Sequence, residues 1–286
     1  AASEAGVDSF IGLGGGSSMD TAKGANFLLT NGGRMHDYWG VNKATKEMLP
    51  LIVIPTTAGT GSECQSFALI SDSKTHQKMA CGDSKAAAKI AILDPGLTLS
   101  QPENVTVCTG IDAIAHAVET AVTNKRNKLS TLFSEESFKL LLPNFTKVLN
   151  QPNDISARGS MLLGAAMAGC AIEASMLGAA HSLANPLTAH YNIVHGQAVG
   201  MMLPYVVRFN SEIEECRGVY VNLMKVAQIE CENESADEVN NLVAYLLNLL
   251  QQTGLPIRLR DVIADKSELK VLAKEASAQW TAGFNP

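Results

Sequence analysis

The pattern of apolar and polar positions divides the chain into two parts with different predicted secondary structure. In the first hundred residues, a helix is predicted around residues 20–29, and short apolar runs predict strands at 10–13, 49–55, 67–70 and 90–93. Strands that alternate with helices and are apolar throughout are typical of a parallel sheet covered on both faces. We therefore expect an α/β portion, an incomplete parallel sheet, at the start of the chain.

After Thr98 the pattern becomes helical and strand-like runs are scarce. The expected helices are 111–122, 134–149, 157–177, 219–231 and 235–253. Six prolines are expected to mark breaks, ends or first turns of helices, at positions 102, 143, 152, 186, 204 and 256. The sequence thus predicts an α/β domain over residues 1–100 and an all-helical domain over residues 101–286.

One apolar stretch, residues 161–180, is long enough to span a membrane. However, Glu173 interrupts it, and its many small residues suit close packing of helices inside a globular protein. We expect a buried core helix, with its end at His181, and no membrane association.

Composition limits the classes of function. Apolar residues make up 46% of the 286 positions and charged residues 17%, which is enough apolar surface for a globular protein with a sizeable core. The formal net charge is −6 and basic residues do not cluster, which argues against a nucleic-acid partner. Six cysteines without a CxxC pair favour free thiols and a cytoplasmic location; they stand at 64, 81, 108, 170, 216 and 231.

Two loops in the first hundred residues are rich in glycine and hydroxyl groups. The first, residues 14–18 (GGGSS), follows a predicted strand and opens a helix, where free N–H groups suit a phosphate. The second, residues 55–63 (PTTAGTGSE), follows the strand at 49–55. Parallel sheets bind ligands at the carboxyl ends of their strands, so together the loops indicate a dinucleotide site. Neither matches GxGxxG or the P-loop motif, and either loop alone could be a plain strand-to-helix turn.

A second group of residues has the chemistry of a metal site. Asp112 and His116 are four positions apart, which places both on one face of a helix. His181 and His195 follow at the two ends of a segment that contains a proline. One carboxylate with three imidazoles suits Fe²⁺ or Zn²⁺, although an Asp–His pair on a helix is often only a local hydrogen bond. His36 and His76 have polar surroundings and are expected at the surface.

Taken in order, these segments resemble the iron-containing alcohol dehydrogenase family, including its members of the lactaldehyde reductase and propanediol dehydrogenase type. The resemblance covers almost the whole chain. It rests on GGGSSMD at 14–20, PTTAGTGSE at 55–63, DP at 94–95, GIDAIAH at 110–116, the histidines 181 and 195, LPY at 203–205 and FNP at 284–286.

The resemblance implies a nucleotide-binding α/β domain, a helical metal-binding domain and an active site between them. It assigns the metal to Asp112, His116, His181 and His195, with Fe²⁺ favoured and Zn²⁺ as the alternative. It assigns contacts with NAD or NADP to Gly15, Gly16, Ser17, Asp20, Thr56, Thr57, Thr60 and Lys78. The implied reaction is hydride transfer between a small alcohol or aldehyde and the nicotinamide, in a homodimer or higher oligomer.

The sequence departs from the family pattern near the expected catalytic residues. Asn185 stands where members often have a histidine, four positions after His181. An amide can hydrogen-bond but cannot relay a proton near neutral pH, so His190 is a candidate substitute. His195, Asn185 and His190 are therefore the expected catalytic residues. Gln65 also replaces a common threonine.

The chain begins one strand ahead of its first glycine loop, whereas family members have further strands and helices there. This difference leaves NAD versus NADP open, and it keeps an inactive fragment as one alternative. A dehydroquinate synthase-like or glycerol dehydrogenase-like enzyme on the same architecture is the other. A dehydroquinate synthase needs basic residues around its site for phosphate and carboxylate groups, and the helical part is poor in clustered lysine and arginine.

Overall fold

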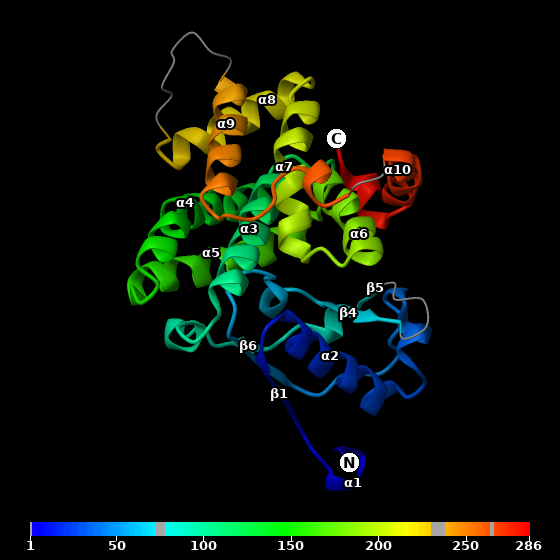
Figure 1. Ribbon diagram of the computed structural model, residues 1–286. Helices are drawn as coiled ribbons and strands as arrows, with labels where there is room; N and C mark the ends of the chain where they lie inside the picture. The colour runs from blue at the N-terminus through cyan, green and yellow to red at the C-terminus, as the bar shows by residue number, and fades with distance from the viewer. Residues whose placement is uncertain (1, 73–77, 230–237, 264–265) are drawn as a thin grey trace.

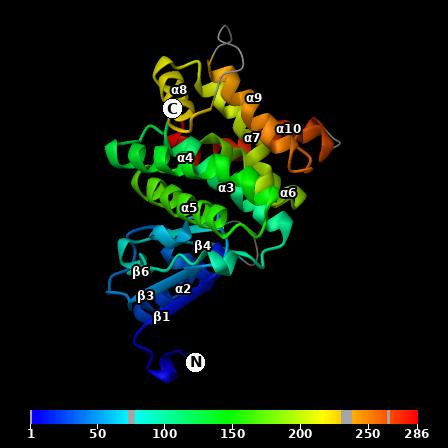
Figure 2. The same cartoon turned by 90° about the vertical axis from the view of Figure 1, so that its left-hand side faces the viewer.

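A computed structural model describes residues 2–72, 78–229, 238–263 and 266–286. The chain forms two parts stacked on one another (Figures 1 and 2). The first part holds all described strands with helix α2, and the second part is built from helices α3 to α10. This arrangement confirms the predicted α/β portion followed by a helical portion.

A three-stranded parallel sheet forms the centre of the first part. Its strands are β1 (Phe10–Gly14), β3 (Leu51–Pro55) and β6 (Ile90–Ala91), in the order β1-β3-β6. Helix α2 (Gly16–Asn31) packs on one face, where Met19 of the helix meets Leu51 and Val53. On edge strand β1 the alternate side chains, Ile11 and Leu13, are exposed. The sheet thus has its helix on one face and apolar side chains on the other.

A second small sheet corrects one expectation from the sequence. The predicted strand at 67–70 is present as β4 (Phe67–Ser71), but it is not part of the parallel sheet. It pairs antiparallel with β5 (Lys78–Gly82), and the two-residue strand β2 (Gly40–Val41) completes the order β2-β5-β4. Aromatic and sulfur side chains fill the space between this sheet and α2, among them Phe27, Tyr38 and Met79.

The second part packs its helices around α3 (Glu103–Thr120), most of whose residues are buried. Its other helices are α4 (Lys128–Asn150), α5 (Ile155–Ser175), α6 (Ala179–Tyr191), α7 (His195–Asn210), α8 (Glu214–Val226), α9 (Glu238–Gln251) and α10 (Leu269–Ser277). Short helical turns connect the elements: η1 (Met35–Tyr38), η2 (Ser62–Cys64), η3 (Ser84–Ala86), η4 (Pro95–Thr98), η5 (Leu259–Asp261), η6 (Lys266–Glu268) and η7 (Trp280–Phe284). The N-terminal turn α1 (Ala2–Ala5) lies away from both parts (Figure 1).

Helix α5 is the apolar stretch that has the length of a membrane span. Among the described residues it is the one helix that meets this test, and 61% of its most apolar window is buried inside the protein. It lies at the junction between the two parts (Figure 2). There its Gly169 meets Gly61 so closely that a Cβ at Gly169 would lie 2.3 Å from the Gly61 carbonyl oxygen. Its small residues therefore allow backbone contact with the first part.

Three details of the helical prediction are wrong. The helix predicted over 157–177 ends at Ser175, because Met176 has φ of 95°, and His181 lies in the next helix rather than at the end of this one. Pro143, Pro186 and Pro204 lie inside α4, α6 and α7 rather than at their ends. Pro102 does precede a helix, as the N-cap of α3. His76 and Cys231 lie outside the described residues.

Candidate metal centre and cofactor loops

Three helices place one carboxylate and three imidazoles at a single point. Asp112 and His116 come from successive turns of α3, His181 from the first turn of α6, and His195 is the first residue of α7. Close packing of α7 on α3 depends on Gly196, where a Cβ would lie only 1.9 Å from the Cys108 carbonyl oxygen. The structure thus brings together the four residues that the sequence motifs single out.

The distances within this cluster match those expected around a small divalent ion. Oδ1 of Asp112 lies 3.5 Å from Nε2 of His116, 3.2 Å from that of His181 and 3.8 Å from that of His195. The ligating atoms of Asp112, His116 and His181 all lie within 4.8 Å of one another. Ligands held about 2.1 Å from a tetrahedral ion are roughly 3.4 Å apart. These distances are compatible with a metal such as Fe²⁺ or Zn²⁺, with Asp112, His116 and His181 as the tightest group and His195 slightly farther out.

Asp112 and His181 form the charged half of the cluster. Burial alone would raise the pKa of Asp112, but the surrounding imidazoles outweigh burial and hold this pKa well below its usual range. At His181 burial is likewise opposed, here by Glu119 and Asp112, and its pKa is raised to about 9. A buried carboxylate is thus kept ionised, as a metal ligand must be.

His116 and His195 form the neutral half. Burial lowers the pKa of both rings, that of His195 to about 3 with Lys78 adding to the shift. A neutral imidazole keeps a lone pair on one ring nitrogen, which is the form that binds metals. The His195 side chain is 26% exposed, against 5% for those of His116 and His181, so the cluster opens to solvent on the side of His195.

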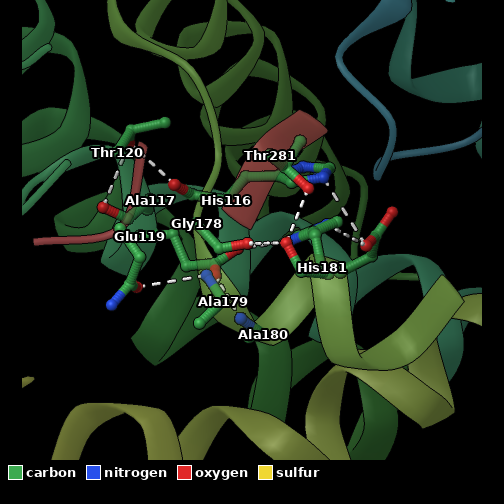
Figure 3. Close-up of polar contacts among 12 residues, drawn as sticks. His116, Ala117, Glu119, Thr120, Gly178, Ala179, Ala180, His181 and Thr281 are labelled. Carbon is green, nitrogen blue, oxygen red and sulfur yellow. Dashed lines mark hydrogen bonds and ion pairs between the residues drawn. The ribbon is translucent and has the colours of Figure 1, made fainter. Parts of the chain in front are cut away.

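Glu119 contacts His181 on the side of the ring that faces away from Asp112, and the sequence analysis missed this residue. One of its carboxylate oxygens is hydrogen-bonded to Nδ1 of His181, and the other accepts the Ala180 N–H at 2.6 Å (Figure 3). This contact leaves Nε2 of His181 as the nitrogen that faces Asp112. Glu119 follows Asp112 by seven positions and so lies on the same face of α3, and this helical spacing is the signal that could have found it.

The C-terminal FNP motif anchors the start of α6. Oδ1 of Asn285 accepts the Ala179 N–H at 3.1 Å, and Nδ2 of Asn285 donates to Asn210 at 2.8 Å. Beside it, the hydroxyls of Thr281 and Ser182 share a buried hydrogen bond of 2.8 Å. These contacts hold the turn of α6 that carries His181 against α7 and the end of the chain.

The other two expected catalytic residues differ in position. Asn185 lies one turn after His181 on α6, half-buried, and its Nδ2 donates to Gln279 Oε1 at 3.2 Å. His190 is exposed near the end of α6, where it pairs with Glu275 of α10 at 2.7 Å. The structure therefore places Asn185 on the face of α6 that carries His181, and it places His190 in a surface ion pair.

The two glycine-rich loops lie side by side at the carboxyl ends of β1 and β3. The N–H of Thr56 donates to the Gly14 carbonyl at 3.0 Å. A Cβ at Gly15 would touch Thr57 at 3.4 Å, and one at Gly16 would lie 2.8 Å from Thr60. Gly16 is thus needed for the close approach of the loops, whereas Gly15 has an ordinary extended conformation with φ of −74° and would place a Cβ only in ordinary contact with Thr57.

Unpartnered polar groups at this junction fit a dinucleotide. Helix α2 begins at Gly16 without a side-chain cap, and the exposed Ser17 lies in its first turn. Within the described residues, the buried hydroxyl of Thr57 has no hydrogen-bond partner. Free donors at the N-terminus of a helix are what phosphate groups bind. These groups support the predicted cofactor site at this edge of the sheet.

A buried ion pair fixes the second loop to α2. Nζ of Lys23, fully buried, donates to the carbonyl and hydroxyl of Ser62 at 2.7 and 2.9 Å and to the Phe67 carbonyl at 2.9 Å. Asp20 accepts from the Ser62 hydroxyl at 2.5 Å and from the Leu69 N–H at 3.1 Å. Asp20 is thus engaged within the protein, and Lys23, three positions later on α2, is a supporting residue that the sequence analysis missed.

Lys78, the last of the expected cofactor residues, starts strand β5 and is exposed. Its positive charge adds to the lowering of the pKa of His195 by burial. The five cysteines that the structure describes, 64, 81, 108, 170 and 216, are free thiols.

Comparison with known proteins agrees with this geometry. A family profile described as "Iron-containing alcohol dehydrogenase" matches residues 1–95, and one described as "Fe-containing alcohol dehydrogenase family, C-terminal" matches residues 106–286. The NAD-dependent methanol dehydrogenase of Bacillus methanolicus is 33% identical over 283 residues, covering 98% of this chain and 73% of the relative. Alcohol dehydrogenase 4 of Schizosaccharomyces pombe is 32% identical, covering 98% of this chain and 65% of the relative.

A solved structure extends the likeness to the fold. The alcohol dehydrogenase from Oenococcus oeni superimposes with a TM-score of 0.93 at 28% identity, covering 100% of this chain and 74% of that one. The chain thus spans about two thirds to three quarters of the length of these relatives, and both of its parts match them.

Proposed function

This chain belongs to the iron-containing alcohol dehydrogenase family, and we propose that it transfers hydride between a small primary alcohol, or the matching aldehyde, and NAD. The observation that carries the proposal is the convergence of three Nε2 atoms on one oxygen of Asp112, at 3.2 to 3.8 Å. Relatives named as methanol and propanediol dehydrogenases support small alcohols as the substrate class.

In this proposal one divalent metal is held by Asp112, His116, His181 and His195, and on binding it His181 gives up the proton that its raised pKa keeps on the ring in the metal-free chain. A metal there acts as a Lewis acid toward an alcohol or carbonyl oxygen. The chain's own contribution is to keep Asp112 ionised, to keep two imidazoles neutral, and to orient His181 through Glu119. The open side at His195 is where the substrate oxygen enters.

The cofactor is proposed to lie along the two glycine-rich loops. The pyrophosphate would face Gly15, Gly16, Ser17 and the buried Thr57 hydroxyl. The same edge of the sheet is lined by Thr56 and Thr60. Asp20 acts with Lys23 to hold the second loop in place. Lys78, whose charge acts on His195, is proposed to contact the cofactor. The protein thereby places the nicotinamide and the substrate carbon next to one another, which is the main contribution of an enzyme to hydride transfer.

The finer assignments rest on the family and on the composition. We propose Fe²⁺ rather than Zn²⁺, because the family is iron-containing, and NAD rather than NADP, because the Bacillus methanolicus relative is NAD-dependent. We further propose that the chain has two domains, over residues 1–100 and 101–286. We also propose that it forms a homodimer or higher oligomer and lies in the cytoplasm. Asn185 is proposed to orient the substrate through its amide, whereas the ion pair of His190 with Glu275 favours a structural role for that histidine.

The experiment that tests this function is an assay of the Fe²⁺-loaded protein under anaerobic conditions. Short primary alcohols and diols are supplied with NAD, and NADH is followed by its absorbance. Alcohol-dependent NADH formation that disappears in Asp112→Asn supports the proposal. A metal-loaded chain that reduces no NAD with any of these alcohols contradicts it and favours the inactive-fragment alternative.

A further inference from the structure

Two half-exposed cysteines lie at the junction between the two parts of the molecule. Cys64 is the last residue of η2, directly after the second glycine-rich loop, and Cys170 lies on α5. The other three cysteines that the structure describes, Cys81, Cys108 and Cys216, are buried. Among the described thiols, these two are therefore the ones that a small reagent reaches from solvent.

Two contacts fix the chain around η2 on one face of α5. At the first contact the backbones touch, because a Cβ at Gly61 would lie 2.6 Å from Cα of Gly169. At the second contact the Glu173 carboxylate accepts from the N–H and the hydroxyl of Ser66, at 2.9 and 2.7 Å. The chain from Gly61 to Ser66 therefore runs along the turn of α5 from Gly169 to Glu173.

This placement brings the two thiols together. Cys64 lies between the two contacts, and its N–H donates at 3.0 Å to the Gly61 carbonyl, the oxygen that lies against Gly169. Cys170 follows Gly169 directly on α5. The hydrogen bond between the two thiols raises the pKa of Cys64 and lowers that of Cys170. Cys170 is thus the thiol that ionises first, and Cys64 is its immediate partner.

The surroundings of the pair suit a small oxidant. Burial and the charges of Glu63 and Glu173 limit the lowering of the Cys170 pKa, so the thiolate forms mainly through its contact with Cys64. The thiolate is the form of cysteine that reacts with oxidants. Thiols that are only half-exposed admit a hydroperoxide more readily than a bulky reagent.

We propose that Cys64 and Cys170 are a redox-active pair, which a hydroperoxide converts to a disulfide that ties the second glycine-rich loop to α5 and weakens NADH binding. With hydrogen peroxide, the Cys170 thiolate attacks one oxygen, the O–O bond breaks, and the leaving hydroxide takes up a proton to give water. Cys64 then attacks the sulfur of the sulfenic acid, and a second water leaves as the S–S bond forms. Two electrons thereby pass from the two sulfur atoms to the peroxide.

The disulfide acts on the cofactor site through the loop. Bond formation draws the two sulfur atoms together, whereas Gly61 and Gly169 already touch and leave η2 no room to approach α5. The displacement therefore passes to the residues before Gly61, among them Thr57 and Thr60. This consequence rests on the proposed function, whereas formation of the disulfide does not.

Mass spectrometry tests the disulfide. Zn²⁺-loaded protein, chosen because Fe²⁺ and peroxide generate radicals, is oxidised with hydrogen peroxide, alkylated and digested with trypsin without reductant. Cleavage after lysine and arginine leaves Cys64 in peptide 47–74 and Cys170 in peptide 159–208. The two peptides should be linked in the parent and in the control Cys216→Ala, and not in Cys64→Ser or Cys170→Ser. A folded, peroxide-treated parent without this link overturns the redox pair.

NADH binding tests the consequence. After removal of the peroxide, the Kd for NADH, measured by its fluorescence, should be about fivefold higher or more in the oxidised parent, and dithiothreitol should restore it. Cys64→Ser should bind NADH like the reduced parent, before and after oxidation. An unchanged Kd in fully cross-linked protein overturns the effect on the loop. A reduced parent that binds no NADH refutes the proposed function instead, and the linked peptides then decide the redox pair by themselves.

Discussion

Glu119 is hydrogen-bonded to Nδ1 of His181, and Nε2 of the same ring lies 3.2 Å from Oδ1 of Asp112. The imidazole is thus held between two carboxylates that lie seven positions, or about two turns, apart on one helix. Glu119 fixes the orientation of the ring, and Asp112 lies on the side where the metal is proposed to bind. Partners of this kind orient metal ligands and increase their basicity.

The first prediction concerns this orientation. Glu119→Gln keeps the size of the side chain but removes the charge that faces His181, so the affinity for Fe²⁺ or Zn²⁺ should fall about 10- to 100-fold. Competition with a chromophoric chelator measures the change. Glu136→Gln, at an exposed position on α4, is the control and should bind metal like the parent. Equal affinity in Glu119→Gln would show that Glu119 has no part in metal binding.

The second prediction concerns the cofactor loop. Gly15 has a conformation that alanine also adopts, and a Cβ there would be in ordinary contact with Thr57. Gly15→Ala should therefore fold and bind metal normally, while its methyl group occupies the approach of the pyrophosphate. We expect NADH binding to weaken at least tenfold, or by about 1.4 kcal/mol. Titration of NADH fluorescence measures this, and unchanged affinity would place the dinucleotide elsewhere.

The third prediction concerns pH and Glu63. Burial raises the pKa of this carboxyl from 4.5 to about 7, and within the described residues its Oε1 has no hydrogen-bond partner. Between these two values the folded chain holds a proton that the unfolded chain has released, so stability falls as pH rises, by roughly 3 kcal/mol in all. Glu63→Gln lacks this dependence. Its free energy of unfolding should therefore improve relative to the parent between pH 5 and pH 8.

Chemical denaturation of both proteins at the two pH values checks this effect. A difference between parent and Glu63→Gln that stays constant with pH would mean that Glu63 titrates with an ordinary pKa in the folded state.

The fourth prediction concerns the contact between α5 and the second loop. In Gly169→Ala the new methyl group would lie 2.3 Å from the carbonyl oxygen of Gly61, which is backbone and cannot turn away. The free energy of unfolding should fall by about 3 kcal/mol. Gly218→Ala on the exposed side of α8 meets no atom within 4 Å and should instead gain about 0.5–1 kcal/mol. Equal free energies of unfolding for the two variants would show that the methyl group at position 169 does not clash with Gly61.

Local sequence patterns predicted the parts of the site that depend on local geometry. The spacing of Asp112 and His116 defines a helix face, and the GGGSS loop follows a strand directly. By contrast, strand β5 begins with a lysine and contains a glycine, and its antiparallel partner is set by contacts outside any local window. The α/β pattern therefore indicated a parallel sheet but not the second sheet beside it.

The supporting residues were harder to predict because they act over long separations in the chain. Glu119 meets His181 across 62 positions, and Glu173 meets Ser66 across 107. The break between α5 and α6 occurs at Met176, which has φ of 95° although a β-carbon disfavours that region. No residue type before Gly178 signals this break, which is why the sequence suggested one continuous helix up to His181.

Metal content measured by elemental analysis tests the central claim most directly. The chain is purified anaerobically beside its His195→Ala variant, which replaces the most exposed of the three histidines. The account predicts close to one Fe or Zn per parent chain, and little or none in the variant, with the same circular dichroism for both. A folded parent chain without metal, or a variant that keeps its full metal content, would contradict the four-ligand site.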